Sequence, residues 1–203
     1  MYKLYDFLSS GNGYKVRLTL TQSGIPYSYH EVNVLKGETR EADFMAINPN
    51  GRIPVLVTPE GDVLTESNAI ICYLAEGTEL MPLDKLERAR VMQWLFWEQY
   101  SHEPFIATSR FWMHLCDPDE FRDKLAERRP GGEFALRLMD KHLEDKQFLV
   151  ADTYSVADIA LYANTHVAHE GGFTLAPYPA VRAWLNRVAA QPDHLTIDDQ
   201  GGV

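Results

Sequence analysis

Strand-like and helix-like patterns alternate along the first eighty residues. Lys3–Phe7 and Tyr27–Val34 are rich in aromatic side chains, which is typical of strands. Between them, Gly13–Ser23 places apolar side chains one helical turn apart, and Gly24 and Pro26 follow as a helix stop. The pattern therefore predicts a β-α-β unit at the start of the chain.

The next stretch predicts a β-hairpin followed by a helix. A short helical piece, Glu41–Ile47, comes first. Two apolar runs, Val55–Val57 and Val63–Thr65, then flank a four-residue turn, and a helix begins at Ser67. A right-handed βαβ unit joined to an antiparallel hairpin forms a mixed four-stranded sheet with helices on its faces. This order predicts an α/β, thioredoxin-like domain over residues 1–77.

The rest of the chain is purely helical in pattern. Leu86–His114 predicts a long helix that Pro104 kinks or divides. The glycine- and proline-containing stretch Arg129–Gly132 predicts a break before another helix over residues 133–144. We therefore assign residues 84–203 to an all-α domain.

Two features mark the end of the helical part. Ser155 and Asp158 have the spacing of a capping box ahead of an apolar run, which predicts that Asp158 caps a helix and stabilises the fold. A last helix begins after Pro177 and covers residues 180–190. The polar, glycine-rich tail Asp198–Val203 is predicted to be mobile.

Composition excludes several classes of partner. The chain has 203 residues and a formal net charge of −10. Without a basic block, this charge argues against nucleic acid or an anionic membrane as a partner, and no apolar run is long enough to span a membrane. The two cysteines are far apart and no signal-peptide pattern appears, which favours the cytoplasm. The seven histidines form no metal-ligand cluster, so no metal is expected.

Candidate chemistry gathers between residues 48 and 67. Pro54 stands at the start of a strand, and a cis bond to Ile53 would turn the chain sharply and offer unpaired backbone groups to a ligand. Ser67 begins a helix, whose first N–H groups favour a carboxylate. Glu66 is placed to meet an ammonium group. The stretch therefore predicts a site for a peptide-like anion.

Six segments spread along the chain carry a further pattern. They are Ser9–Leu18, Asn48–Leu56, Leu64–Ile70, Glu98–Pro104, Ser155–Ala160 and Tyr178–Leu185. Taken in this order, they make almost the whole chain similar to cytosolic glutathione transferases of a bacterial type. The resemblance implies a thioredoxin-like domain that binds glutathione, an all-helical domain that adds an acceptor site, and a homodimer.

The resemblance places thiol activation in the turn before the first helix. Glutathione reacts as the thiolate, and lowering its thiol pKa by about two units requires about 2.7 kcal/mol. One hydroxyl hydrogen bond and the helix N-terminus supply energies of this size. By spacing alone Ser10 is an ordinary capping serine, but serine-type members place their activating hydroxyl in this turn. Asn12 is the second candidate, a one-residue shift would select Ser9, and Tyr5 and Tyr14 are weaker candidates.

The resemblance also implies ligands for the two ends of glutathione. Ser67 would bind the γ-glutamyl carboxylate and Glu66 the ammonium group, although a plain helix cap at Ser67 is the simpler interpretation. Ile53, before Pro54, would bind the cysteinyl part through its backbone. A basic residue would bind the glycyl carboxylate. The candidates for it are Arg52, which is equally well explained as a surface arginine, and the weaker Lys36.

The acceptor site is the least determined part. Aromatic side chains at helical spacing are usually core, so Trp94, Trp97 and Trp112 are assigned to packing. Polar groups beside Pro104 are better candidates, because that proline leaves backbone groups unpaired. The polar groups meant are His102 and Arg110. The full set of candidates, from the first loop and the kinked helix, is Leu8, His102, Phe105, Ile106, Arg110 and Phe111.

The expected function is conjugation of glutathione to a small electrophilic, hydrophobic acceptor. A glutathione-dependent isomerase, dehalogenase or peroxidase fits the same first domain, and so does a binding module that kept the fold and lost the chemistry. A glutaredoxin-type reductase needs a cysteine at the first helix, and none lies between Tyr2 and Leu20.

Overall fold

The chain divides into two compact units. In the computed structural model, which describes residues 1–202, the first unit is Met1–Thr78 together with the residues from Pro192 onward, and the second is Glu79–Gln191. The sequence-based assignment of residues 84–203 to one helical domain differs at its C-terminal end. The reason is that the last residues pack with the first unit.

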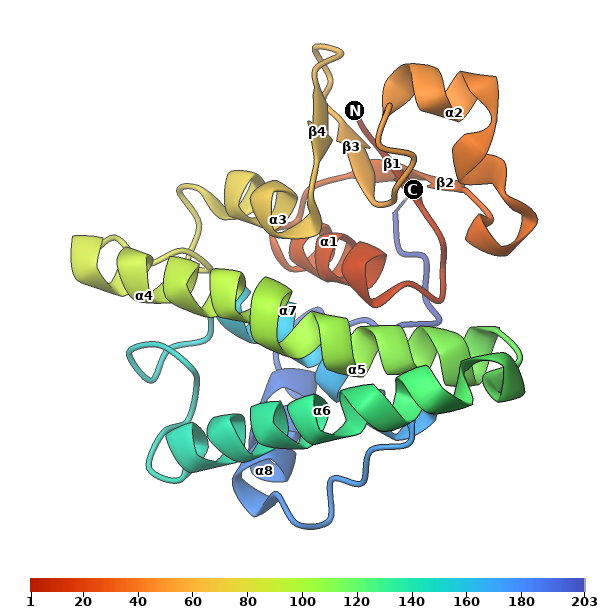
Figure 1. The fold of residues 1–203 in the computed structure, drawn as a ribbon. Coiled ribbons are helices and arrows are strands. Elements are labelled where there is room, and N and C mark those ends of the chain that lie inside the picture. Colours follow the sequence, from red (N-terminus) through yellow and green to blue (C-terminus); the bar gives the residue numbers. More distant parts are fainter. Residues whose placement is uncertain (203) are drawn as a thin grey trace. The chain divides into compact units, whose positions relative to one another are not determined.

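The first unit has a thioredoxin-like arrangement, as predicted. Its elements are β1 (Tyr2–Asp6), α1 (Gly11–Gln22), β2 (Tyr27–Glu31), η1 (Val34–Lys36), η2 (Glu38–Arg40), α2 (Ala42–Ile47), β3 (Val55–Val57), β4 (Val63–Thr65) and α3 (Ser67–Ala75). The strand order is β2-β1-β3-β4, with β1 parallel to β2 and the other pairs antiparallel. Helices α1 and α3 lie side by side along the sheet (Figure 1).

The strand register decides which side chains face which helices. Leu4 of β1 pairs with Leu56 of β3, and both are completely buried. Asp6 follows Leu4 by two residues, so it points to the same face, where it bonds to α1. On the opposite face, Val55 packs with Phe44 of α2. The alternation thus brings a carboxylate into the interior beneath α1.

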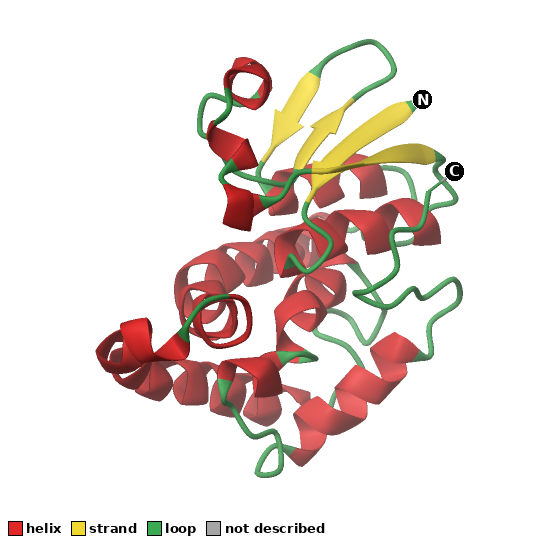
Figure 2. Cartoon of the chain, turned by 90° about the vertical axis from the view of Figure 1, so that its right-hand side faces the viewer, coloured by secondary structure: helices red, strands yellow, loops and turns green. Residues whose placement is uncertain are grey.

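The second unit is built from helices. Its elements are α4 (Lys85–Trp97), η3 (Glu98–His102), α5 (Glu103–Arg110), η4 (Phe111–Leu115), η5 (Pro118–Phe121), α6 (Arg122–Leu143), α7 (Val156–Thr165), η6 (Ala168–Gly171) and α8 (Pro179–Ala189). Both η3 and η4 are π-helical turns. Every residue of α7 is buried, and it contacts α4, α5 and α8. Figure 2 shows that the four strands of the sheet all belong to the first unit.

Pro104 divides the predicted long helix, as expected. Helix α4 ends at Trp97, and the π-helical turn η3 separates it from α5. Pro104 therefore falls in the first turn of α5. A proline is tolerated in the first turn of a helix because its missing N–H removes no hydrogen bond within α5 itself.

The predicted break at Arg129–Gly132 is wrong. Helix α6 continues from Arg122 to Leu143 with Pro130 inside it. A Cβ atom on Gly131 would lie 2.5 Å from the ring of Phe105, and one on Gly132 would overlap the ring of Phe173. The two glycines therefore allow close packing of aromatic rings against α6, and they do not form a turn.

The predicted mobility of the tail Asp198–Val203 does not hold for residues 198–202; Val203 lies outside the described residues. Tyr27 of β2 donates a hydrogen bond from its hydroxyl to the carbonyl oxygen of Gln200 over 2.6 Å. Gly201 packs so closely that a Cβ atom there would overlap the same hydroxyl. The tail is therefore held against the first unit. None of the helices in the part of the chain that the structure describes is both long and apolar enough to cross a membrane.

Candidate active site

Ser10 stands at the N-terminus of α1. It is the N-cap residue, and its Oγ accepts a hydrogen bond from the backbone N–H of Gly13 over 3.2 Å. A serine hydroxyl has two acceptor positions and one proton to donate. Capping uses only an acceptor position, so Ser10 can cap the helix and still donate its proton to a thiolate. The two interpretations of this serine are therefore compatible.

The N-termini of α1 and α3 meet at Asn12 and Ser67. The hydroxyl of Ser67 donates to Oδ1 of Asn12 over 3.3 Å. Each helix N-terminus carries a partial positive charge from its unpaired N–H groups. Two such ends beside each other favour an anion. The structure thus brings one thiol-activating candidate, Asn12, within hydrogen-bond distance of the predicted carboxylate ligand, Ser67.

Lys15 adds a full positive charge to this site, and the sequence analysis did not find it. Its side chain is completely buried on α1. The Nζ atom lies 3.4 Å from Oγ of Ser67 and 3.3 Å from Oδ1 of Asn68. A single lysine inside a buried helix breaks the apolar pattern without indicating where its charge goes. Only the packing of α1 on α3 reveals its place.

Glu66 adopts a rare backbone conformation. Its φ of 66° and ψ of 110° lie where a residue other than glycine costs roughly 1–3 kcal/mol, and such residues concentrate at functional sites. Glu66 is the N-cap residue of α3 without a side-chain capping bond, and Ser67 is the first helical residue. The simpler interpretation of Ser67 as the helix cap is therefore wrong. The turn exposes the Glu66 side chain and buries that of Ser67.

The peptide bond between Ile53 and Pro54 is cis. A buried asparagine, Asn48, holds the preceding loop: its Nδ2 donates to the carbonyl oxygen of Arg52 over 2.8 Å, and its Oδ1 accepts from the backbone N–H of Asn50 over 3.1 Å. Ile53 is half-buried beside the core cluster of α2 and β3. The loop that carries the predicted cysteinyl ligand is thus fixed by side-chain bonds to backbone.

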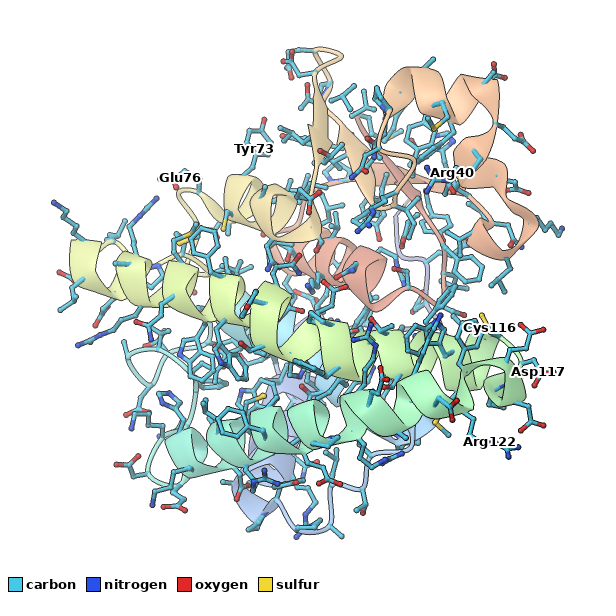
Figure 3. The ribbon with its side chains drawn as sticks, viewed as in Figure 1. Arg40, Tyr73, Glu76, Cys116, Asp117 and Arg122 are labelled. Carbon is cyan, nitrogen blue, oxygen red and sulfur yellow. The ribbon has the colours of Figure 1, made fainter. Side chains whose placement is uncertain are left out.

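A basic side chain, that of Arg40, contacts that loop. Arg52 and Lys36 are both exposed. Arg40 of η2, labelled in Figure 3, donates from Nη1 to the carbonyl oxygen of Asn50 over 3.2 Å. Gly51 has a φ of 61°, and a Cβ atom there would overlap the Arg40 guanidinium. Arg40 was absent from the sequence-based candidates because its contact with this loop is purely tertiary.

A buried ion pair lies next to the Ser10 turn. Nε of Arg17 donates to Oδ2 of Asp6 over 3.1 Å, and both side chains are completely buried. Burial raises the pKa of the Asp6 carboxyl to about 7, although the Arg17 guanidinium opposes this shift. A Cβ atom on residue 13 would overlap the Asp6 carboxylate. Helix α1 can therefore approach β1 only because Gly13 occupies that position.

Comparison with known proteins decides the family. The family model for the glutathione S-transferase N-terminal domain matches residues 9–76, and the family model for the glutathione S-transferase C-terminal domain matches residues 94–192. The chain belongs to the glutathione S-transferase family. The fold predicted from the sequence is the fold of this family.

Three relatives illustrate the range of this family. The chain is 31% identical to the disulfide-bond oxidoreductase YfcG of Escherichia coli, covering 95% of this chain and 92% of that protein. A crystal structure of a glutathione S-transferase from Pseudomonas fluorescens has a TM-score of 0.94 and 46% identity, covering 98% and 99% of the two chains. A glutathione transferase from Pseudomonas putida, solved with one glutathione disulfide per subunit, has a TM-score of 0.84 and 26% identity, covering 95% and 88%.

Of the acceptor-site candidates implied by the family resemblance, three are buried within the helical unit. His102 is completely buried, and its Nε2 lies 2.9 Å from Oγ1 of Thr165. Ile106 is also completely buried. Nε of Arg110 donates to Oε2 of Glu170 over 2.5 Å. These contacts hold the helices together, and contact with an acceptor stays a prediction for all three.

The other acceptor-site candidates are more accessible. Phe111 is 37% exposed, and Phe105 is half-buried against Gly131. In the first unit, Leu8 is half-buried, and its backbone N–H donates to Oε2 of Glu31 over 3.3 Å. Among residues 1–202, no group of three or more His, Cys, Asp or Glu side chains is arranged to hold a metal ion.

Proposed function

We propose that this family member is a glutathione transferase that joins the glutathione thiolate to a small, hydrophobic electrophile. The observation that carries the proposal is the meeting of the α1 and α3 N-termini at the Asn12–Ser67 hydrogen bond. Two positive helix ends, a buried lysine and a serine hydroxyl with a proton to donate suit a ligand that has both a carboxylate and a thiolate.

Glutathione binds in this proposal through its two charged ends. Its γ-glutamyl carboxylate bonds to the hydroxyl and backbone N–H of Ser67, with Lys15 nearby. Its ammonium group meets the exposed carboxylate of Glu66. The backbone of Ile53 holds the cysteinyl part, and the glycyl carboxylate meets Arg52 or Lys36. Because the ligand is anchored at both ends, its thiol is confined near the N-terminus of α1.

Chemistry in this proposal begins with loss of the thiol proton to solvent water. The hydroxyl of Ser10 donates a hydrogen bond to the thiolate, and the helix dipole of α1 adds to its stabilisation. The thiolate then attacks the electrophilic carbon, forming a C–S bond. In a substitution, the bond between that carbon and the leaving group breaks, and its electron pair departs with the leaving group. In an addition, the π electrons of the activated double bond move to the neighbouring atom, which is then protonated by water. Ser10 keeps its own proton throughout, so it is a donor and not a nucleophile.

Replacing Ser10 by alanine tests this role. In Ser10→Ala the pKa of the bound thiol should rise by about one to two units, since a hydrogen bond to a charged group contributes roughly 1.5–3 kcal/mol. The measurement is the ultraviolet absorbance of bound thiolate as a function of pH. The matched control is Ser9→Ala, for which no change is expected. If Asn12→Ala raises the pKa and Ser10→Ala does not, the asparagine amide is the donor.

A second candidate function is reduction of disulfides by bound glutathione, because the chain is 31% identical to a disulfide-bond oxidoreductase. The bound thiolate would attack a disulfide sulfur, expel one thiolate and form a mixed disulfide, which a second glutathione would release as glutathione disulfide. The reaction needs no cysteine from the protein. Turnover of a small organic disulfide with glutathione, but not of an aryl halide, would favour this reaction over conjugation.

We propose further that the protein is a cytoplasmic homodimer. Helix α4 and the following turn expose a row of large apolar side chains at a spacing of four residues. They are Met92 (38% exposed), Phe96 (68%) and Tyr100 (85%). Residues four apart share one face of a helix, and a continuous exposed apolar face marks an interaction site. A second copy of the chain, presenting the same row, is the occupant we propose.

Charge on this face should separate the subunits. Phe96→Glu places a carboxylate on the proposed contact, where pairing would bury it beside its symmetry mate. The variant should sediment as a monomer at concentrations where the wild type is a dimer. Phe134→Glu is the matched control, because Phe134 is 56% exposed and lies on a different helix, α6. Monomeric wild type, or a dimeric Phe96→Glu variant, would refute this interface.

A further inference from the structure

Arg17 connects three parts of the first unit. Its side chain is completely buried on α1. Nε donates to the carboxylate of Asp6 at the end of β1, and Nη2 donates to the carbonyl oxygen of Leu8 over 2.6 Å. Nη1 donates to the carbonyl oxygens of Ile197, over 3.0 Å, and Asp199. One planar guanidinium thus bonds to the strand, to the turn that leads to Ser10, and to the C-terminal tail.

Leu8 is one of the residues that hold the turn that presents Ser10. The backbone N–H of Ser10 donates to the carbonyl oxygen of Phe7 over 2.7 Å. Leu8 is held on both sides, because its N–H donates to Glu31 and its carbonyl oxygen accepts from Arg17. Leu8 precedes Ser10 by two residues, so a shift at its carbonyl group moves the turn.

The tail is docked at several points along the described segment. Tyr14 of α1 donates to the carbonyl oxygen of Leu195 over 2.7 Å, and Tyr27 donates to that of Gln200. The side chains of Leu195 and Ile197 are both buried. Figure 1 shows this segment, in dark blue, passing α1 on its way to the sheet. The tail therefore has a defined position next to Arg17.

We propose that the C-terminal segment, residues 194–202, positions the thiol-activating turn through Arg17. The inference rests on the proposed function, in which Ser10 donates to the thiolate. Arg17 is a positioning residue in it. The segment would therefore support the active site although Ile197 lies 180 residues from Arg17 in the sequence.

The rigidity of the guanidinium explains the coupling. Its five N–H groups lie in one plane and cannot rotate independently. Without the tail carbonyls, the buried Nη1 hydrogens lose their acceptors, and a buried unsatisfied donor is unfavourable. The plane then tilts to reach other acceptors or water, and the Nη2 bond to Leu8 moves with it. A small displacement of Ser10 weakens its hydrogen bond to the thiolate, since such bonds depend steeply on geometry.

The test undocks the tail in the full-length protein. In Ile197→Asp a carboxylate replaces a buried side chain, which should detach the segment and speed amide hydrogen exchange there. Thr196→Asp is the matched control, because the neighbouring Thr196 is exposed and its charge faces solvent. We expect Ile197→Asp to raise the pKa of the bound thiol by about half to one unit. From a wild-type value of about 6.5, this leaves about 1.5- to threefold less thiolate at pH 7. Glutathione affinity should change by less than about threefold.

A second variant disrupts the same contacts by changing the guanidinium instead of the tail. Arg17→Lys keeps the positive charge beside Asp6 but loses the planar group that joins Leu8 to the tail. It should raise the thiol pKa as Ile197→Asp does. The inference is overturned if Arg17→Lys lowers the unfolding temperature but leaves the thiol pKa unchanged. It is also overturned if Ile197→Asp speeds amide exchange in the tail but leaves the thiol pKa unchanged. Either result would show that the tail is only structural.

Failure of the inference is distinguishable from failure of the proposed function. If the wild type binds glutathione with a lowered thiol pKa that responds to Ser10→Ala, but to neither Ile197→Asp nor Arg17→Lys, the proposed function stands and the inference falls. If the wild type does not bind glutathione, or leaves its thiol pKa near its ordinary value, both fall.

Discussion

Asp158→Ala will lower the free energy of unfolding by about 4 kcal/mol. The Asp158 carboxylate is completely buried at the N-terminus of α7 and accepts four hydrogen bonds. Oδ1 accepts from the backbone N–H of Leu149 over 3.0 Å and from Nε1 of Trp184 over 2.8 Å. Oδ2 accepts from the backbone N–H and the hydroxyl of Ser155, over 3.1 and 3.2 Å.

The size of this effect follows from what the substitution leaves behind. Removing the carboxylate strands two buried backbone N–H groups and an indole N–H, each of which costs roughly 1–3 kcal/mol when unsatisfied. Burial raises the pKa of Asp158 to about 6, while the four donors favour the ionised form and oppose that shift. The carboxylate therefore joins the start of α7, the loop before it and α8. Its loss affects all three at once.

Thermal and denaturant unfolding, followed by tryptophan fluorescence, measure this loss. The matched control is Asp84→Ala, which removes another aspartate that caps a helix. Asp84 accepts from the N–H groups of Leu86 and Glu87 at the start of α4, but it is exposed, so water can replace it and a cost of only about 1 kcal/mol is expected. Equal losses in the two variants would mean that the network around Asp158 adds nothing to ordinary capping.

Local sequence signals predicted some elements of the helical unit correctly and others wrongly. The spacing of Ser155 and Asp158 is a local signal, and it predicted the capping box correctly. The local signal at Pro130 and the glycines after it predicted a break that does not exist. A glycine can form a turn, or it can allow an aromatic ring from another helix to pack closely against a continuous helix. Only the fold distinguishes Gly131 packed against Phe105 from a glycine in a loop.

The site divides in the same way. Composition and periodicity placed Ser10 and Ser67 at strand-to-helix turns, and the structure has them there. Their roles toward glutathione came only from the family resemblance and stay predictions. The contact of Lys15 with Ser67 and that of Arg17 with Ile197 join residues 52 and 180 positions apart. No periodic pattern carries such pairings. The positive φ of Glu66 could not be predicted from the sequence either, because a residue other than glycine rarely adopts it and no local pattern marks where one does.

Ser67→Ala and Glu66→Ala should each weaken glutathione binding by about ten- to a hundredfold, the largest functional effects we expect. A hydrogen bond to a charged group contributes roughly 1.5–3 kcal/mol, and 1.4 kcal/mol is a factor of ten in affinity. Ser67→Ala removes the hydroxyl that bonds to Asn12 and, in the proposed site, to the γ-glutamyl carboxylate. Glu66→Ala removes the partner of the ammonium group, and alanine must adopt the same positive φ.

Calorimetric titration with glutathione measures both losses. Glu60→Ala is the control, because Glu60 is an exposed acid in the turn between β3 and β4 of the same unit, and its removal should leave affinity unchanged. Lost binding in the two site variants, with a normal control, would locate the γ-glutamyl end at the start of α3. Unchanged affinity in both would place glutathione elsewhere. No binding by the wild type would instead favour a module that keeps only the fold, and the search would turn to protein partners.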